Sequence, residues 1–212
     1  MYKTHGVACQ QYAQANAENL MDIILMIVLS IQQNWLGVGE QLTDVRIHGA
    51  ESRFLWGKDQ VPVISKAKTY AYLEDNKHRL YADVMMIIDY DDGHDINKAK
   101  KLMDVFLDVD GLGLAKAGFA CQLVAGLVGC MDVHNIRRYG IDPKTLSLSR
   151  NPKTFKGIAA NDRKIVDYIG MCHNYGTENL WDTWCEFLST KSKRWIDADH
   201  VSEVHYTYLT GE

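Results

Sequence analysis

Residues 107–117 read LDVDGLGLAKA and hold two glycines, Gly111 and Gly113, on either side of one leucine. Upstream of this stretch, apolar residues recur at helical spacing, namely Ala99, Leu102, Met103 and Phe106. Downstream, small and apolar residues continue from Leu114 to about Leu127. This spacing predicts two helices, over residues 96–109 and 114–127, joined by a tight turn at the two glycines.

The glycine turn has a physical meaning beyond joining two helices. Glycine tolerates positive φ angles and lets another backbone approach closely. The turn leads into a helix N-terminus, whose unpaired N–H groups and partial positive charge suit a phosphate. On its own, the same pattern also fits a plain turn between two helices.

The rest of the chain is also predominantly helical by pattern. Residues 10–36 predict one or two helices, and the nine-residue run IILMIVLSI (23–31) is too short to cross a membrane, so we expect it to be buried on all sides. Residues 45–63 are mixed, and VRIH and RFLW there fit either short strands or a loop. Further helices are expected over residues 65–74, 75–88, 162–173, 180–188 and 199–209, and one opening at 131–134. We therefore predict one mainly α domain over residues 1–212, with a hairpin at 96–128 and a possible short β insertion at 45–63.

Charge is distributed unevenly along the 212 residues, whose net charge is -4. Residues 1–136 hold 12 basic and 17 acidic residues, whereas residues 137–164 hold eight basic and two acidic ones. The overall balance argues against a general nucleic-acid binder, because such proteins neutralise phosphates with many cations. The basic segment fits either a solvated loop or a surface that faces phosphates.

The cysteines and acidic turns give no metal pattern. Five cysteines with long spacings and no CxxC motif predict buried free thiols in a reducing, cytoplasmic compartment. The polar start, residues 1–11, does not resemble a signal peptide. The turn DYDDGHD (89–95) fails as a calcium loop, because Gly93 falls at position 5 and Lys100 at position 12. We expect neither a metal nor a cofactor, and Asp95 is available to cap the next helix.

Three strings together resemble the helix-hairpin-helix (HhH-GPD) DNA glycosylase superfamily. LDVDGLGLAKA (107–117) is similar to the family's L-P-G-V-G-x-K-x-A, and MDVHNIR (131–137) is similar to V-D-T-H-x-x-R. LSIQQ (29–33) looks like the family's L-S-x-Q stretch. The resemblance covers roughly residues 20–140, with an apparent insertion between Val45 and Val63, and it implies a two-lobed helical fold.

The resemblance implies roles for named residues. The family extrudes a nucleotide from duplex DNA and cleaves its glycosidic bond. Asp132 matches the family's acid, which stabilises the oxocarbenium-like sugar. The amides of Gly111 and Gly113 would hold a backbone phosphate, and Gln32 or Gln33 would fill the gap in the base stack. The cations implied to face DNA are Lys116, Arg137 and Arg138.

The sequence departs from the family pattern at two positions, one at the lysine nucleophile and one beside the phosphate site. Lyase members place a lysine nucleophile two residues after the second glycine, where this chain has Ala115. Lys116 lies one residue later, about 100° around the helix. We therefore expect a monofunctional N-glycosylase without Schiff-base chemistry. Asp110 replaces the usual proline beside the phosphate site, and its charge would repel DNA.

The strings KAGFACQL (116–123) and GCMDVHN (129–135) also resemble small proteins of tailed bacteriophages. Such a protein could modify bases, or it could be a virion component that kept the fold and lost the reaction, with phage structural proteins as partners. The host cytoplasm or the virion is then the expected location, with no membrane partner. Elsewhere, His134, Trp181 and Trp184 are expected to be structural.

Overall fold

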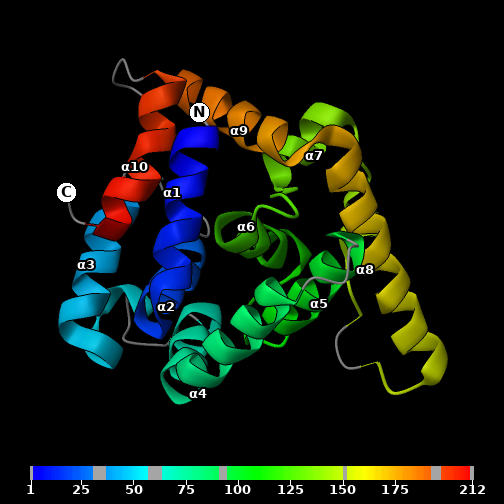
Figure 1. The fold of residues 1–212 in the computed structure, drawn as a ribbon, viewed down its shortest axis with the longest axis horizontal. Helices are drawn as coiled ribbons and strands as arrows, with labels where there is room; N and C mark the ends of the chain where they lie inside the picture. Colours follow the sequence, from blue (N-terminus) through cyan, green and yellow to red (C-terminus); the bar gives the residue numbers. More distant parts are fainter. Residues whose placement is uncertain are drawn as a thin grey trace.

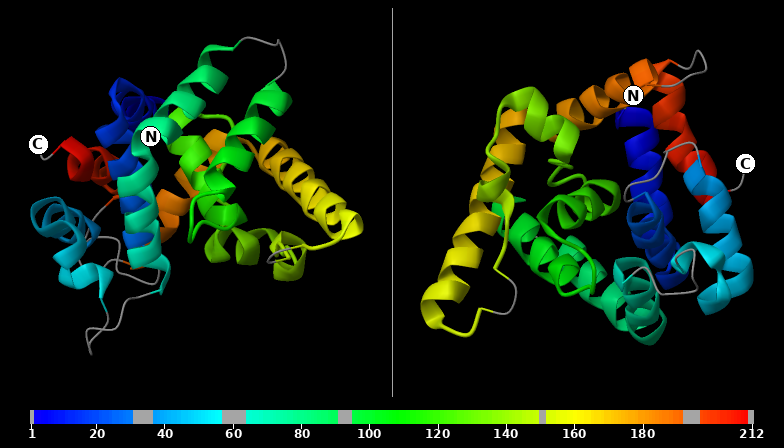
Figure 2. Two further views of the ribbon diagram at one scale, coloured as in Figure 1. Left: turned by 90° about the horizontal axis from the view of Figure 1, so that it is seen from below. Right: turned by 180° about the vertical axis from the view of Figure 1, so that it is seen from behind.

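The computed structural model describes residues 2–30, 37–56, 64–90, 95–149, 152–191 and 197–210. Over these ranges the chain forms ten α-helices and no β-strand, which confirms the mainly α prediction. Figure 1 shows the helices arranged as a ring around α6, and Figure 2 shows the same arrangement from below and from behind. The helices are α1 (Tyr2–Ala15), α2 (Ala17–Leu29), α3 (Val38–His48), α4 (Ile64–Asp89), α5 (Asp95–Leu107), α6 (Leu114–Ala125), α7 (Val133–Tyr139), α8 (Phe155–Tyr175), α9 (Thr177–Lys191) and α10 (Ala198–Thr210).

The second half of α2 and helix α6 form the centre of the core. Residues Ile23–Leu29 of α2 are each at most 2% exposed, which confirms the prediction of a helix buried on all sides. Helix α6 packs against α1, α2 and α5. Gly118 lets the loop before α7 approach α6 closely, since a Cβ on Gly118 would lie 2.6 Å from the Gly129 carbonyl oxygen. The apolar core extends as one cluster from Tyr2 to Leu209.

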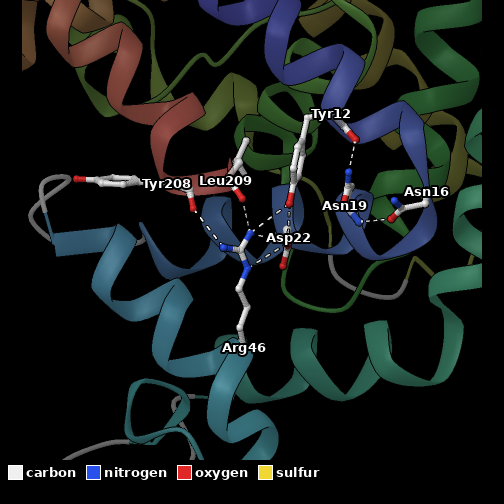
Figure 3. A network of polar contacts seen from close by, with 7 residues as sticks. All are labelled: Tyr12, Asn16, Asn19, Asp22, Arg46, Tyr208 and Leu209. Atoms are coloured by element: carbon white, nitrogen blue, oxygen red, sulfur yellow. Dashed lines mark hydrogen bonds and ion pairs between the residues drawn. The ribbon is translucent and has the colours of Figure 1, made fainter. Parts of the chain in front are cut away.

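The first predicted helical region is two helices rather than one. Asn16 separates them and caps α2, because its side chain accepts a hydrogen bond from the Asn19 N–H at 2.9 Å. The Asn19 side chain in turn donates to the Tyr12 carbonyl at 3.0 Å (Figure 3). These bonds fix the angle at which α2 enters the core.

The strands considered for residues 45–63 are not formed in the part that the structure describes. VRIH (45–48) is the last turn of α3, and RFL (53–55) is a short 3-10 helix capped by Ser52. The β-branched residues that suggested a strand fill a helix instead, because Val45 is buried against the core. Residues 57–63 lie outside the described part.

A polar network centred on Arg46 joins helices α1, α2 and α3 to α10. Arg46 in α3 donates to Asp22 Oδ2 at 2.6 Å and to the Leu209 carbonyl at 2.7 Å (Figure 3). Tyr12 donates to the same carboxylate oxygen at 3.0 Å. The Arg46 side chain thereby ties α10 to α2, using carbonyls that the end of a helix leaves unpaired.

The five cysteines are free and buried, which confirms that prediction. Burial raises the pKa of every one of these thiols, that of Cys9 and of Cys172 to about 12. Thiols of the unfolded chain ionise near pH 8.5. The folded protein therefore holds protons that the unfolded chain loses between these values.

We expect the free energy of unfolding to be unaffected by the thiols below about pH 8.5. Above it, stability should fall by about 1.4 kcal/mol per pH unit for each thiol, because the unfolded state binds fewer protons. Urea titrations at pH 7.5, 9 and 10 measure this slope. Cys172→Ala should make the slope shallower by one thiol's share, and an unchanged slope would contradict the assignment.

Candidate functional site

The predicted helical hairpin is present between α5 and α6. Gly111 has φ of +93°, a backbone conformation that other residues rarely adopt, whereas Gly113 is extended and precedes α6. Leu112 between them is only 8% exposed, so it anchors the turn in the core. Both glycines are exposed. The turn therefore presents its backbone to solvent, as phosphate binding requires.

A threonine from α4 fixes the other side of the turn. Thr69, fully buried, donates its hydroxyl to the Asp110 carbonyl at 2.5 Å. The Leu112 N–H donates to the Val109 carbonyl at 3.1 Å. The Asp110 side chain itself is exposed. This aspartate, which stands where the glycosylase family usually has proline, therefore places a negative charge at the surface of the turn.

Lys116, in the first turn of α6, reaches the end of α2. Its Nζ lies 3.3 Å from Ser30 Oγ. Ser30 is the last described residue of the LSIQQ stretch (29–33), and the described part of that stretch therefore ends beside the hairpin helix. Gln32 and Gln33 lie outside the described residues, and their predicted role stays a prediction.

A second lysine lies at the same helix end and was missed by sequence analysis. Lys66 in α4 is 5% exposed and donates from Nζ to the Leu29 carbonyl at 3.1 Å. Burial lowers the pKa of this ammonium group. Two lysines thus complement the partial negative charge at the C-terminus of α2.

Asp132 begins α7 as its N-cap. Its Oδ1 accepts hydrogen bonds from the His134 and Asn135 N–H groups, both at 2.9 Å. In the described part of the chain, Oδ2 has no hydrogen-bond partner, and the residue is partly exposed. The carboxylate therefore caps a helix and keeps one oxygen available.

Lys116 and Asp132 act on the same thiol. Burial is the main cause that raises the pKa of Cys130; the Asp132 charge raises it further, and the Lys116 charge lowers it. The thiol that both charges influence lies in the loop between α6, which carries Lys116, and α7, which Asp132 caps.

The loop that carries Asp132 is held by buried hydrogen bonds. The Tyr168 hydroxyl accepts from the Met131 N–H at 2.9 Å and donates to the Gly129 carbonyl at 2.8 Å. Gln122 Oε1 accepts from the Cys130 N–H at 3.2 Å. Sequence analysis missed both supports, because each joins residues through a side chain with no local pattern.

Arg137 and Arg138 are exposed in the last turn of α7, where a positive charge is favourable. Nearby, the ring centroids of His134 and Phe187 are 4.0 Å apart in a stacked arrangement. Trp181 is 1% exposed, which confirms its predicted place in the core. Trp184 is half-buried and packs against the core.

A surface groove of about 620 Å³ lies along α8 and not at Asp132 or the hairpin. Within the described ranges, no three His, Cys, Asp or Glu side chains are grouped so that they could hold a metal ion. Over the same ranges, no helix combines the length and apolarity that crossing a bilayer requires. The groove is lined by Val166, Asp167, Gly170, Met171, Asn174 and Tyr175.

No protein-family model matches the chain, and comparison with curated proteins and with solved structures likewise finds no match. The resemblance to the glycosylase superfamily therefore stays a prediction that depends on the three strings.

Proposed function

We propose that this chain is a two-lobed helix-hairpin-helix protein that binds DNA and acts on an extruded base. One observation carries the proposal. The exposed glycine turn leads into α6, and Lys116 in the first turn of that helix lies 3.3 Å from Ser30 Oγ at the end of α2. This contact joins two of the three segments that resemble the family, and Asp132 in the third segment begins α7.

The proposed chemistry is hydrolysis of the glycosidic bond. Water adds to the anomeric carbon, the bond to the base breaks, and the base leaves with the bonding electrons and gains a proton. Positive charge develops on the sugar in the transition state, and the free Oδ2 of Asp132 is suited to stabilise it. Lys116 takes no covalent part in this mechanism, since the position of the family's nucleophile is Ala115.

The proposed phosphate contact is tested by Gly113→Ala. Its φ of -107° suits any residue, and a Cβ there meets no atom within 4 Å, so the fold should tolerate alanine at a cost of at most about 1 kcal/mol. The added methyl group would keep a phosphate away from the backbone amides. We expect affinity for duplex DNA to fall about tenfold, measured by fluorescence anisotropy at several salt concentrations.

Gly170→Ala in α8 is the matched control, because a Cβ there also meets no atom within 4 Å. It should leave DNA affinity unchanged. Equal affinity of Gly113→Ala and the unmodified protein would show that the hairpin does not bind phosphate.

A second candidate function is that of a non-enzymatic bacteriophage structural protein. The capping of α7 favours it, because Asp132 then has a structural role that needs no DNA. The net charge of -4 favours it as well. Absence of salt-dependent DNA binding by the unmodified protein would support this candidate.

A further inference from the structure

The start of α8, here the α8 tip (residues 152–164), projects from the rest of the molecule. In Figures 1 and 2 its helical turns, coloured yellow, extend beyond the other helices in every view. The buried residues of α8 begin only at Ile165. Phe155 is nevertheless 87% exposed on the tip, and Ile158 is 49% exposed. Side chains three positions apart on a helix are neighbours, so these two form one small exposed apolar surface.

The α8 tip is positively charged. It contains one acidic residue, Asp162, and four basic residues, which are Lys153, Lys156, Arg163 and Lys164. Lys100 of α5 lies 3.6 Å from Asp162, so this carboxylate already faces a cation. Lys153 and Lys156, on either side of Phe155, are exposed and form no salt bridge within the part of the chain that the structure describes. Their charges are therefore available to an anion.

The segment before α8 lies against the tip and adds a cation. The Ser149 N–H donates to Asn161 Oδ1 at 2.9 Å, and the Asn161 amide donates to the Ser149 carbonyl at 3.0 Å. The short 3-10 helix η4 (Pro143–Leu146) comes just before Ser149, contacts α8 and carries the exposed Lys144. Asp142 caps η4 by accepting a hydrogen bond from the Lys144 N–H at 3.0 Å.

The sign of this surface is opposite to that of the whole protein. Among the described residues of 137–164, seven are basic and two are acidic, whereas the net charge of the chain is -4. Segregated charge of one sign raises the local concentration of ligands of the other sign. A partner that carries many negative charges therefore suits this surface.

We propose that the α8 tip binds single-stranded nucleic acid, with an unpaired base stacked on Phe155 and phosphates beside Lys153 and Lys156. Cations that follow the backbone, together with an aromatic side chain that stacks on a base, are the two parts of single-strand binding without sequence preference. Neither contact distinguishes ribose from deoxyribose, so the proposal covers DNA and RNA strands alike.

Two other polyanions fit the surface less well. In duplex DNA the base faces are covered by the neighbouring bases, so an exposed phenylalanine has no face on which to stack. Binding to an anionic bilayer scales with the apolar area that is buried, and the tip offers only Phe155 and Ile158 as large apolar side chains. A single strand uses both the cations and the aromatic ring.

Fluorescence anisotropy with labelled oligo(dT) and oligo(rU) of about 15 nucleotides tests the proposal. We expect both to bind and their affinity to fall as salt rises. Phe155→Leu keeps an apolar side chain but removes the ring, and should weaken binding about tenfold. Phe155→Trp keeps a ring that stacks and should bind at least as tightly as the unmodified protein. Equal affinity of Phe155→Leu and the unmodified protein would overturn the proposal.

A matched pair of double variants tests the phosphate contacts. Lys153→Gln with Lys156→Gln should make the slope of log affinity against log salt shallower by roughly 1.4, because each phosphate contact of a single strand contributes about 0.7. Lys3→Gln with Lys68→Gln removes the same charge from exposed positions in α1 and α4 and should keep the slope. Folding should be intact in both, since all four side chains are at the surface. Equal slopes would contradict the assignment.

The remaining arms separate this site from the other surfaces. The inference goes beyond the proposed function, and Gly113→Ala should leave oligonucleotide affinity unchanged. A protein that binds duplex DNA through the hairpin but neither oligonucleotide would overturn this inference and leave the proposed function in place. Vesicles of phosphatidylcholine with phosphatidylserine should not bind, and binding to them without binding to the oligonucleotides would show that the tip contacts a bilayer instead.

Discussion

Asp132→Asn should abolish most base release while leaving the fold and DNA affinity intact. Asparagine caps a helix as well as aspartate does, so the hydrogen bonds to the His134 and Asn135 N–H groups can be kept. Asparagine is neutral and cannot offset the positive charge that develops on the sugar. We expect single-turnover rates to fall on the order of 10²–10³-fold, the loss that follows removal of one preorganised electrostatic group.

The measurement uses duplexes that contain uracil, oxidised, alkylated or hypermodified bases. Thermal unfolding and DNA binding of the same variant are the controls for fold and affinity. Asp132→Ala should additionally lose about 0.5–2 kcal/mol of stability, because it removes the cap. A variant Asp132→Asn with full turnover would show that the carboxylate only caps α7. An unmodified protein that releases none of these bases would favour the structural-protein candidate.

Gly118→Ala should destabilise the protein by about 3 kcal/mol, although alanine is the better helix former. A Cβ at this position would lie 2.6 Å from both the Gly129 carbonyl oxygen and the Tyr168 hydroxyl. Tyr168 is fully buried and bonds the Gly129 and Met131 backbones, so it cannot move without leaving those groups unpaired. Both the steric overlap and the lost hydrogen bonds oppose the variant.

The same substitution at Gly170 is the matched comparison. This glycine lies inside α8 with no atom within 4 Å of its Cβ position, so alanine there should stabilise the helix by up to about 1 kcal/mol. Urea unfolding followed by circular dichroism measures both variants. Equal stability of Gly118→Ala and the unmodified protein would mean that α6 and the loop before α7 do not pack closely.

The helices whose apolar residues meet the core could be predicted from spacing. This holds for α5, in which the predicted core residues Ala99, Leu102, Met103 and Phe106 are all buried. The prediction from spacing was wrong for the first half of α8. We expected this helix to begin at residue 162, whereas it begins at Phe155. Most side chains of residues 155–163 are exposed, so no apolar period marks this part of the helix.

Polar supports of the site could not be predicted, because their partners are distant in the sequence. Lys66 is buried against the Leu29 carbonyl, 37 positions away, and Arg46 binds the Leu209 carbonyl, 163 positions away. A lysine in a helix with other charges ordinarily suggests an exposed face. The turn at Gly111 and Gly113 could be predicted, because it depends on local backbone geometry, which short sequence patterns record.

The way α1 is seated has a consequence for synthesis on the ribosome. The Tyr2 N–H donates to Asp182 at 3.1 Å, and α1 packs against α9 and α10. Because the ribosome makes α1 before α9 and α10, the packing of α1 is incomplete until residues 177–210 have been made. During that delay the apolar run Ile23–Leu29 lacks part of its native cover. Apolar surface that is exposed during folding is prone to aggregation, so we expect slow translation of residues 177–210 to favour aggregation.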